Sequence, residues 1–211
     1  MGIQLTGARP RPPTRQLNNS GRVRELTPET LPLFKRLFEE SHVACFCNYW
    51  HFEGNKNEWL EKCAFRAEEN FAEQEARVRS GASASRGLLY IENDRALGWM
   101  KLVPLATIPK LRKLPVYKSI DLGNEEATYG VGCFLVHPEH RGRGLARAML
   151  QEASSFLRRW GGDCIAGFPR RTSDRLYPEE VWQGPESLFL KGNFDILHDV
   201  APYPVLKKTL R

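Results

Sequence analysis

The sequence has no run of apolar residues near the ~18 needed to cross a bilayer, and its basic N-terminus has no apolar segment typical of a secretory signal. Cysteine is sparse and odd in number, without the spacing of a disulfide framework, which favours free thiols and a reducing compartment. We therefore expect a cytoplasmic protein with no membrane partner. The five cysteines are Cys45, Cys47, Cys63, Cys133 and Cys164.

The sequence also has no stretch in which basic and aromatic residues alternate, and no module typical of nucleic-acid binding. Its formal net charge of +6 therefore does not indicate a nucleic-acid partner. The charge is compatible with an acidic small molecule such as a polyphosphate cofactor. We expect no nucleic-acid partner.

The chain of 211 residues has the length of one globular domain, and 41% of its residues are hydrophobic. Residues 1–20 are rich in Pro, Arg, Asn and Gly and show no periodicity, which indicates a flexible leader. Residues 21–211 are expected to form a single domain.

Hydrophobic periodicity and turn residues predict an α/β chain with a mixed sheet. Asn93-Asp94 joins two β-rich runs as a hairpin, and a strand-helix-strand crossover after residue 130 makes its two strands parallel. Residues 104–125 are expected to be an irregular loop that forms part of an acceptor pocket or its lid. Strands are expected at 23–26, 87–92, 96–103, 130–136, 164–167, 194–198 and 205–210, and helices at 31–41, 55–80, 145–157 and 185–191.

The most informative segment is 135–146, which joins a buried strand to an amphipathic helix through a glycine-spaced turn. The first backbone N–H groups of a helix have no intrahelical partners, and the helix dipole is positive there. Gly142 and Gly144 allow a phosphate to approach this backbone without a Cβ in the way. Arg141, Arg143 and Arg147 add positive charge, so the turn is a candidate anion site.

The pattern Arg-x-x-Gly-x-Ala over 141–146 resembles the pyrophosphate-binding signature of the GNAT superfamily of acetyl-CoA-dependent N-acetyltransferases. A dinucleotide-binding turn is the main competitor, and it would need a glycine where Arg147 stands and an acidic residue after the next strand. That strand instead ends in Pro169-Arg170-Arg171, which disfavours the competitor.

The resemblance implies a GNAT-like fold, in which a mostly antiparallel mixed sheet has one splayed parallel strand pair and flanking helices. Main-chain groups of Phe134, Leu135 and Val136 would bind the pantetheine arm of acetyl-CoA, and an N–H near Phe134 would polarise the thioester carbonyl. The pyrophosphate would be held by Arg141, Gly142, Arg143, Gly144, Leu145, Ala146 and Arg147.

The catalytic acid and base are less defined. Phe189 stands where many members have the tyrosine that protonates the departing thiolate, within a segment that resembles the family's Tyr-x-x-x-Gly-Phe. Gly130 stands where members that use a glutamate base have it. Glu126 acting through a water is the candidate base, and Tyr129 is the reserve acid; solvent-exposed carboxylates and a packing tyrosine are the alternative.

The segment 45–51 holds two thiols, an imidazole and two aromatic rings. Three interpretations are open: a zinc site with Cys63, a helix end that packs buried thiols, and a wall of the acceptor site. The early helices of the GNAT fold border the acceptor, which favours Tyr49, Trp50 and His51 as acceptor-binding residues. Cys133 and Cys164 are expected to be apolar fillers of core strands, and no metal is expected.

Two functions fit the sequence. The first is an N-acetyltransferase in which a primary amine of a small molecule or peptide attacks acetyl-CoA directly in a ternary complex. The second is a non-catalytic GNAT-like module that binds an acyl-CoA as a regulatory ligand. A monomer and a homodimer are both compatible with the chain.

Overall fold

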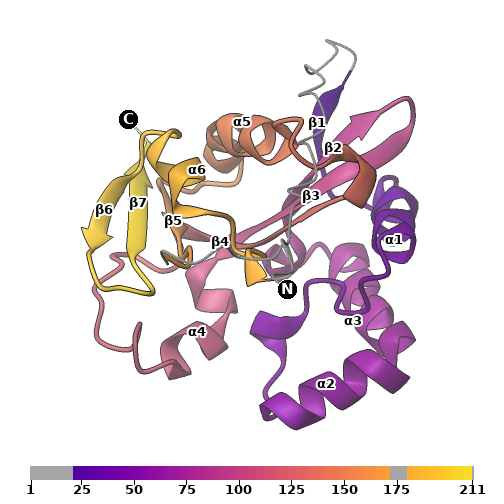
Figure 1. Ribbon diagram of the computed structural model, residues 1–211, viewed down its shortest axis with the longest axis horizontal. Helices are drawn as coiled ribbons and strands as arrows, with labels where there is room; N and C mark the ends of the chain where they lie inside the picture. The colour runs from indigo at the N-terminus through magenta and orange to yellow at the C-terminus, as the bar shows by residue number, and fades with distance from the viewer. Residues whose placement is uncertain (1–20, 172–179, 211) are drawn as a thin grey trace, which may run out of the picture.

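A computed structural model describes residues 21–171 and 180–210 (Figure 1). Its centre is a seven-stranded sheet in the order β1-β2-β3-β4-β5-β7-β6. Only β4 and β5 pair in parallel, which confirms the expected mixed, mostly antiparallel sheet. The strands are β1 (Arg22–Glu25), β2 (Gly87–Glu92), β3 (Arg95–Pro104), β4 (Thr128–Val136), β5 (Cys164–Gly167), β6 (Asp195–His198) and β7 (Val205–Thr209).

Helices cover both faces of the sheet. On one face, α5 and α6 pack against the sheet in the largest apolar cluster; on the other, α1, α3 and α4 cover it and α2 packs beside α3 (Figure 1). No described helix has the length and apolar character to span a membrane. The helices are α1 (Leu31–Glu40), α2 (Lys56–Phe65), α3 (Ala67–Arg79), α4 (Pro109–Lys113), α5 (Leu145–Arg159) and α6 (Glu186–Leu190).

The local patterns explain why these elements form. In α5 the apolar stripe Leu145, Met149, Leu150, Ala153 and Leu157 is buried, as its helical spacing predicts. The hairpin turn between β2 and β3 places both of its central residues, Asn93 and Asp94, at positive φ, as a tight two-residue turn requires.

The strand that leads to the glycine turn separates from its parallel neighbour. β4 pairs with β5 only over Thr128–Gly130, although it pairs with β3 as far as Val136. Gly132 is the extra residue of a bulge in the β3–β4 ladder. The splayed strand pair that the resemblance implied is therefore present, and the second edge of β4 has no adjacent strand beyond Gly130.

The expected irregular loop at 104–125 is packed instead of open. It contains the short helix α4, and Leu111, Tyr117 and Leu122 are buried. Arg112 donates to Glu125 and to the carbonyls of Tyr117 and Ile120, which closes the segment on itself. The segment contributes Pro109, Lys110, Lys113 and Leu114 to a cavity beside Trp50, so its role as part of an acceptor pocket or its lid stays a prediction.

Two cysteines form a disulfide that the sequence did not suggest. Cys47, in the loop after α1, is bonded to Cys133 on β4, 86 residues away in the chain. The expectation that Cys133 is an apolar filler with a free thiol was therefore wrong. The thiols of Cys45, Cys63 and Cys164 are free.

We predict that reduction of Cys47–Cys133 lowers the free energy of unfolding by about 2–4 kcal/mol, because the bond restricts a long loop of the unfolded chain. Urea unfolding with and without reductant measures the difference, and thiol titration in denaturant counts the reactive cysteines. The unpaired Cys63→Ser is the control. Five reactive thiols before reduction would show that the bond does not form.

Candidate active site

The turn between β4 and α5 has the backbone that its glycines predict. Gly142 and Gly144 have φ of 77° and 87°, in the left-handed region that favours glycine. Gly144 is the N-cap of α5, and no side chain caps the first turn. A Cβ built on Gly142 would meet no atom within 4 Å, so space is open beside this backbone. The N–H groups at the start of α5 are therefore available to an anion.

The three arginines of the turn differ in their surroundings. Arg143 is 12% exposed and donates from Nη2 to both carboxylate oxygens of Glu92 at 3.1 Å, and its Nη1 lies 2.6 Å from His140 Nδ1. Arg141 is exposed, and its Nε lies 3.4 Å from the Val136 carbonyl. Arg147 is exposed on the first turn of α5. Arg143 therefore ties the turn to β2, which was not expected.

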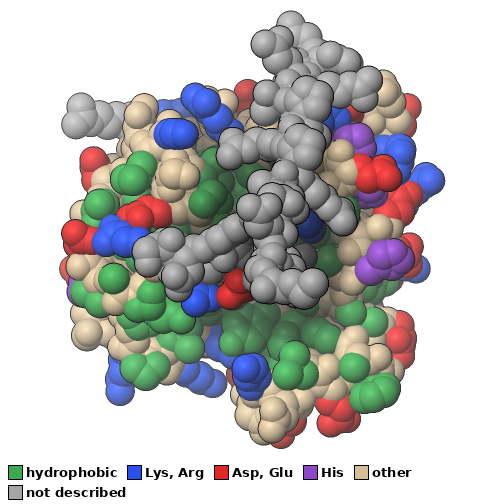
Figure 2. All heavy atoms as spheres, in the orientation of Figure 1, with side chains coloured by type: hydrophobic (Ala, Val, Ile, Leu, Met, Phe, Trp, Pro, Cys, Tyr) green, Lys and Arg blue, Asp and Glu red, His purple; other side chains and the backbone are tan. Residues whose placement is uncertain are grey.

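A cavity of about 770 Å³ lies beside this turn. The end of β4, the loop after α1, one face of α2 and residues 181–188 surround it, and Figure 2 shows hydrophobic side chains in the hollow beside α2. The structure brings together seven of the expected site residues along its wall, which are Tyr49, Trp50, Phe134, Leu135, Val136, Arg141 and Ala146. Leu145 is buried in the core instead, so only its backbone faces the turn.

Trp182 is a wall residue that the sequence analysis missed. Its carbonyl accepts a hydrogen bond from the Phe134 N–H at 2.6 Å. Its ring centroid lies 5.8 Å from that of Tyr49 and 5.6 Å from that of Trp50. The N–H group expected to polarise a thioester is thus bonded to the backbone of residue 182. No local pattern in the polar segment around Trp182 could have shown this.

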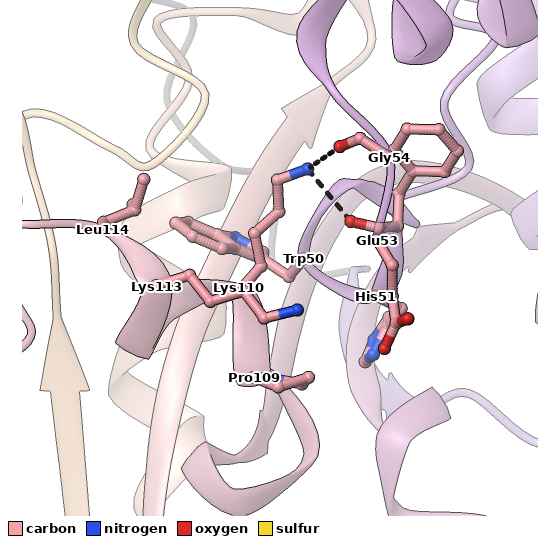
Figure 3. A pocket seen from close by; sticks show the side chains of 9 residues that line it. Trp50, His51, Glu53, Gly54, Pro109, Lys110, Lys113 and Leu114 are labelled. Atoms are coloured by element: carbon pink, nitrogen blue, oxygen red, sulfur yellow. Dashed lines mark hydrogen bonds between the residues drawn. The ribbon is translucent and has the colours of Figure 1, made fainter.

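His51 does not line the large cavity. It faces a second cavity of about 200 Å³, together with Glu53, Lys110 and neighbouring residues (Figure 3). Its Nδ1 lies 3.0 Å from the Thr107 carbonyl. Burial, with the nearby positive charges of Lys101 and Arg77, lowers the pKa of His51 to about 3, so the ring is neutral. His51 was expected to line one acceptor site together with Tyr49 and Trp50, but Tyr49 lines only the large cavity and His51 only the small one.

Neither expected proton-transfer residue lines the cavity. Tyr129 is 2% exposed and stacks on Trp160 in the core, where its hydroxyl accepts from Arg86 and burial raises its pKa. Glu126 is exposed in the turn before β4. From Tyr129 to Phe134 the strand rises about 17 Å. The geometry therefore does not support either residue as the acid or base.

Phe189 is a core residue behind the cavity. It is fully buried, with ring centroids 6.3 Å from Phe134 and 5.3 Å from Phe194. Its ring does not line the cavity, so it can influence a bound cofactor only through residues such as Phe134 that do. Asn193 has a φ of 59°, as expected where the family pattern has glycine.

The cysteine-rich segment does not form a metal cluster within the described residues. Cys47 is in the disulfide, and burial raises the pKa of the Cys45 thiol to about 11, which disfavours the thiolate that a metal requires. Elsewhere in the described residues, one group of potential metal ligands does converge, and it consists of His137, Glu139 and His140.

A family model described as the acetyltransferase (GNAT) family matches residues 34–179, which is more than half of the chain. The chain belongs to this family. It is therefore an acetyltransferase that depends on acetyl-CoA, as the resemblance implied.

Solved structures support the fold at low sequence identity. The PaiA N-acetyltransferase of Thermoplasma acidophilum, in complex with coenzyme A, is 12% identical, with a TM-score of 0.54. A protein described as a GNAT-family acetyltransferase from Desulfovibrio desulfuricans is 16% identical, with a TM-score of 0.51. Each comparison covers 90% of this chain and 99% of the other. No curated protein sequence matches the chain significantly.

We predict that Arg143→Ala lowers the free energy of unfolding by about 1.5–3 kcal/mol, because it removes two charge-assisted hydrogen bonds to Glu92. Arg147→Ala is the matched control from the same turn, and we expect it to stay within about 0.5 kcal/mol of the unmodified protein. Urea unfolding measures both. Equal losses in the two variants would contradict a structural role specific to Arg143.

Proposed function

We propose that the protein transfers the acetyl group of acetyl-CoA to a primary amine by direct attack in a ternary complex. The observation that carries this proposal is a single cavity that joins three parts: the edge of β4 beside which no strand lies, the uncapped start of α5 and a wall of aromatic rings. The β4 edge suits the pantetheine arm of coenzyme A, and the start of α5 suits the pyrophosphate. The aromatic rings border the space that remains for the acceptor.

The residues present fit the cofactor. Backbone groups of Phe134–Val136 lie on the cavity wall where β5 no longer pairs with β4, so the pantetheine arm can supply hydrogen bonds of the kind that a strand makes. The N–H groups from Gly142 to Arg147 and the exposed Arg141 and Arg147 side chains suit the pyrophosphate. This arrangement supports the assignment of coenzyme A to the cavity.

The Phe134 N–H has two alternative partners in this proposal. In the structure it donates to the Trp182 carbonyl. To stabilise the oxyanion that forms when an amine attacks the thioester, it must release that carbonyl and donate to the substrate oxygen. The backbone at residue 182 therefore has to shift when acetyl-CoA binds.

The described wall of the cavity offers no carboxylate for proton transfer, although His42 and Tyr49 lie on it. In this proposal the attacking amine arrives uncharged, and its proton leaves to water or to the departing thiolate. Positioning of the two substrates supplies the main catalytic effect in this mechanism.

The second function that fits the sequence, a module that binds an acyl-CoA without turnover, disagrees with the family assignment. One observation is in its favour: the described wall has no carboxylate, and Tyr49 is the one phenol on it. Release of the coenzyme A thiol in the presence of a panel of primary amines separates the two functions. Coenzyme A binding with no release of thiol from acetyl-CoA by any amine would favour the binding module.

We predict that Gly142→Glu weakens coenzyme A binding at least about a hundredfold, because its carboxylate would project beside the helix start and repel the pyrophosphate. Gly161→Glu is a matched control, since Gly161 also has a positive φ and open space but follows the other end of α5. Titration calorimetry measures both. Unchanged affinity in the Gly142 variant would contradict the cofactor site.

A further inference from the structure

The acceptor side of the large cavity is built from aromatic rings around one tyrosine. Tyr49 has its ring centroid 5.5 Å from that of Trp50, 5.6 Å from that of Trp59 and 5.8 Å from that of Trp182. These four residues, here called the aromatic wall, come from the loop after α1, from α2 and from the segment before α6. All four line the cavity.

The aromatic wall is fixed next to the expected reaction centre. Trp50 Nε1 donates to the carbonyl of Gly132, the bulged residue of β4, at 2.8 Å. The carbonyl of Trp182 accepts from the Phe134 N–H. Trp50 through its ring, and Trp182 through its backbone, are therefore bonded to the β4 positions on either side of Cys133. An acceptor that reaches a thioester beside Phe134 has to pack against these rings.

The described wall of the cavity has basic side chains and no carboxylate. The ionisable groups on its described wall are His42, Lys56 and Arg141, the phenol of Tyr49 and the Cys45 thiol, whose pKa burial raises to about 11. A ring face can attract a cation, but the ammonium of Lys110 already lies 4.5 Å from the Tyr49 ring centroid. A substrate with several ammonium groups would find no carboxylate to pair with among the described wall residues.

We infer that the acceptor is an aromatic primary amine that carries no other positive charge. This inference rests on the proposed acetyl transfer. Offset or edge-on contact between aromatic rings is worth about 0.5–1.5 kcal/mol per pair beyond the burial of area, so several rings together favour an aromatic substrate. A positive surrounding also lowers the pKa of a bound amine, which supplies the uncharged nucleophile without a catalytic carboxylate.

The two substrates supply all the atoms and electrons that the reaction needs. The lone pair of the amine nitrogen attacks the thioester carbonyl carbon, a C–N bond forms, and the C–S bond breaks as coenzyme A leaves as a thiolate. The proton lost by the amine goes to the thiolate directly or through water. The products are an N-acetyl aromatic amine and coenzyme A.

The first test compares p-toluidine, 2-phenylethylamine and spermidine as acceptors, with thiol release as the measurement. We expect kcat/KM for the better aromatic amine to exceed that for spermidine at least about tenfold, which corresponds to 1.4 kcal/mol. Equal or faster reaction of spermidine would overturn the inference and leave the proposed acetyl transfer intact. No thiol release with any amine would overturn both.

The second test introduces a carboxylate. Leu60 lines the cavity from α2 and is 54% exposed, so Leu60→Glu is expected to fold. We expect it to shift the ratio of kcat/KM values toward spermidine about threefold, the effect of a partly exposed ion pair. Phe65→Glu is the matched control, because Phe65 is 78% exposed on the same helix but does not line the cavity.

Circular dichroism and thermal unfolding verify that both variants keep the fold. A shift of the kcat/KM ratio toward spermidine in Leu60→Glu and not in Phe65→Glu supports an acceptor site beside α2. It also supports the view that this site disfavours cations because it has no carboxylate. An unchanged ratio in a folded Leu60→Glu protein, or an equal shift in Phe65→Glu, would overturn the placement of the acceptor against the aromatic wall.

Discussion

The divergence of β4 from β5 after Gly130 is the constraint on which the rest of the site depends. A strand whose second edge loses its neighbour keeps N–H and C=O groups that need partners. Here the Gly132 carbonyl accepts from Trp50, and the Phe134 N–H donates to the Trp182 carbonyl. Both partners belong to the aromatic wall, so the backbone edge proposed to bind the cofactor also contacts the residues proposed to bind the acceptor.

The chemistry that the cavity supports follows from its electrostatics. Positive groups and apolar rings surround the expected reaction centre, while the carboxylate and phenol expected from the sequence lie at the far end of β4 or in the core. In the proposed mechanism, such a site disfavours the ammonium form of an acceptor and gains its rate from positioning. Beside it, the ion pair of Arg143 with Glu92 connects the glycine turn to β2.

The sequence alone was sufficient for features that depend on neighbouring residues. The Asn93-Asp94 turn, the apolar stripe of α5 and the paired glycines before it were all predicted, because periodicity and backbone preference act over a few positions. The same local patterns predicted the mixed sheet, since a strand-helix-strand crossover makes its two strands parallel. The fold then placed the end of β4 next to the start of α5.

Tertiary structure decided the features that join distant segments. Cys47 and Cys133 meet across 86 residues, Trp182 reaches β4 from beyond the next strand, and Tyr129 packs in the core instead of facing the cavity. The side of a strand on which a residue lies shifts with each bulge, and the bulge at Gly132 changes the register of β4. The sequence therefore determined the fold and the glycine turn before α5, whereas only the packing of separate elements determined which side chains form the aromatic wall.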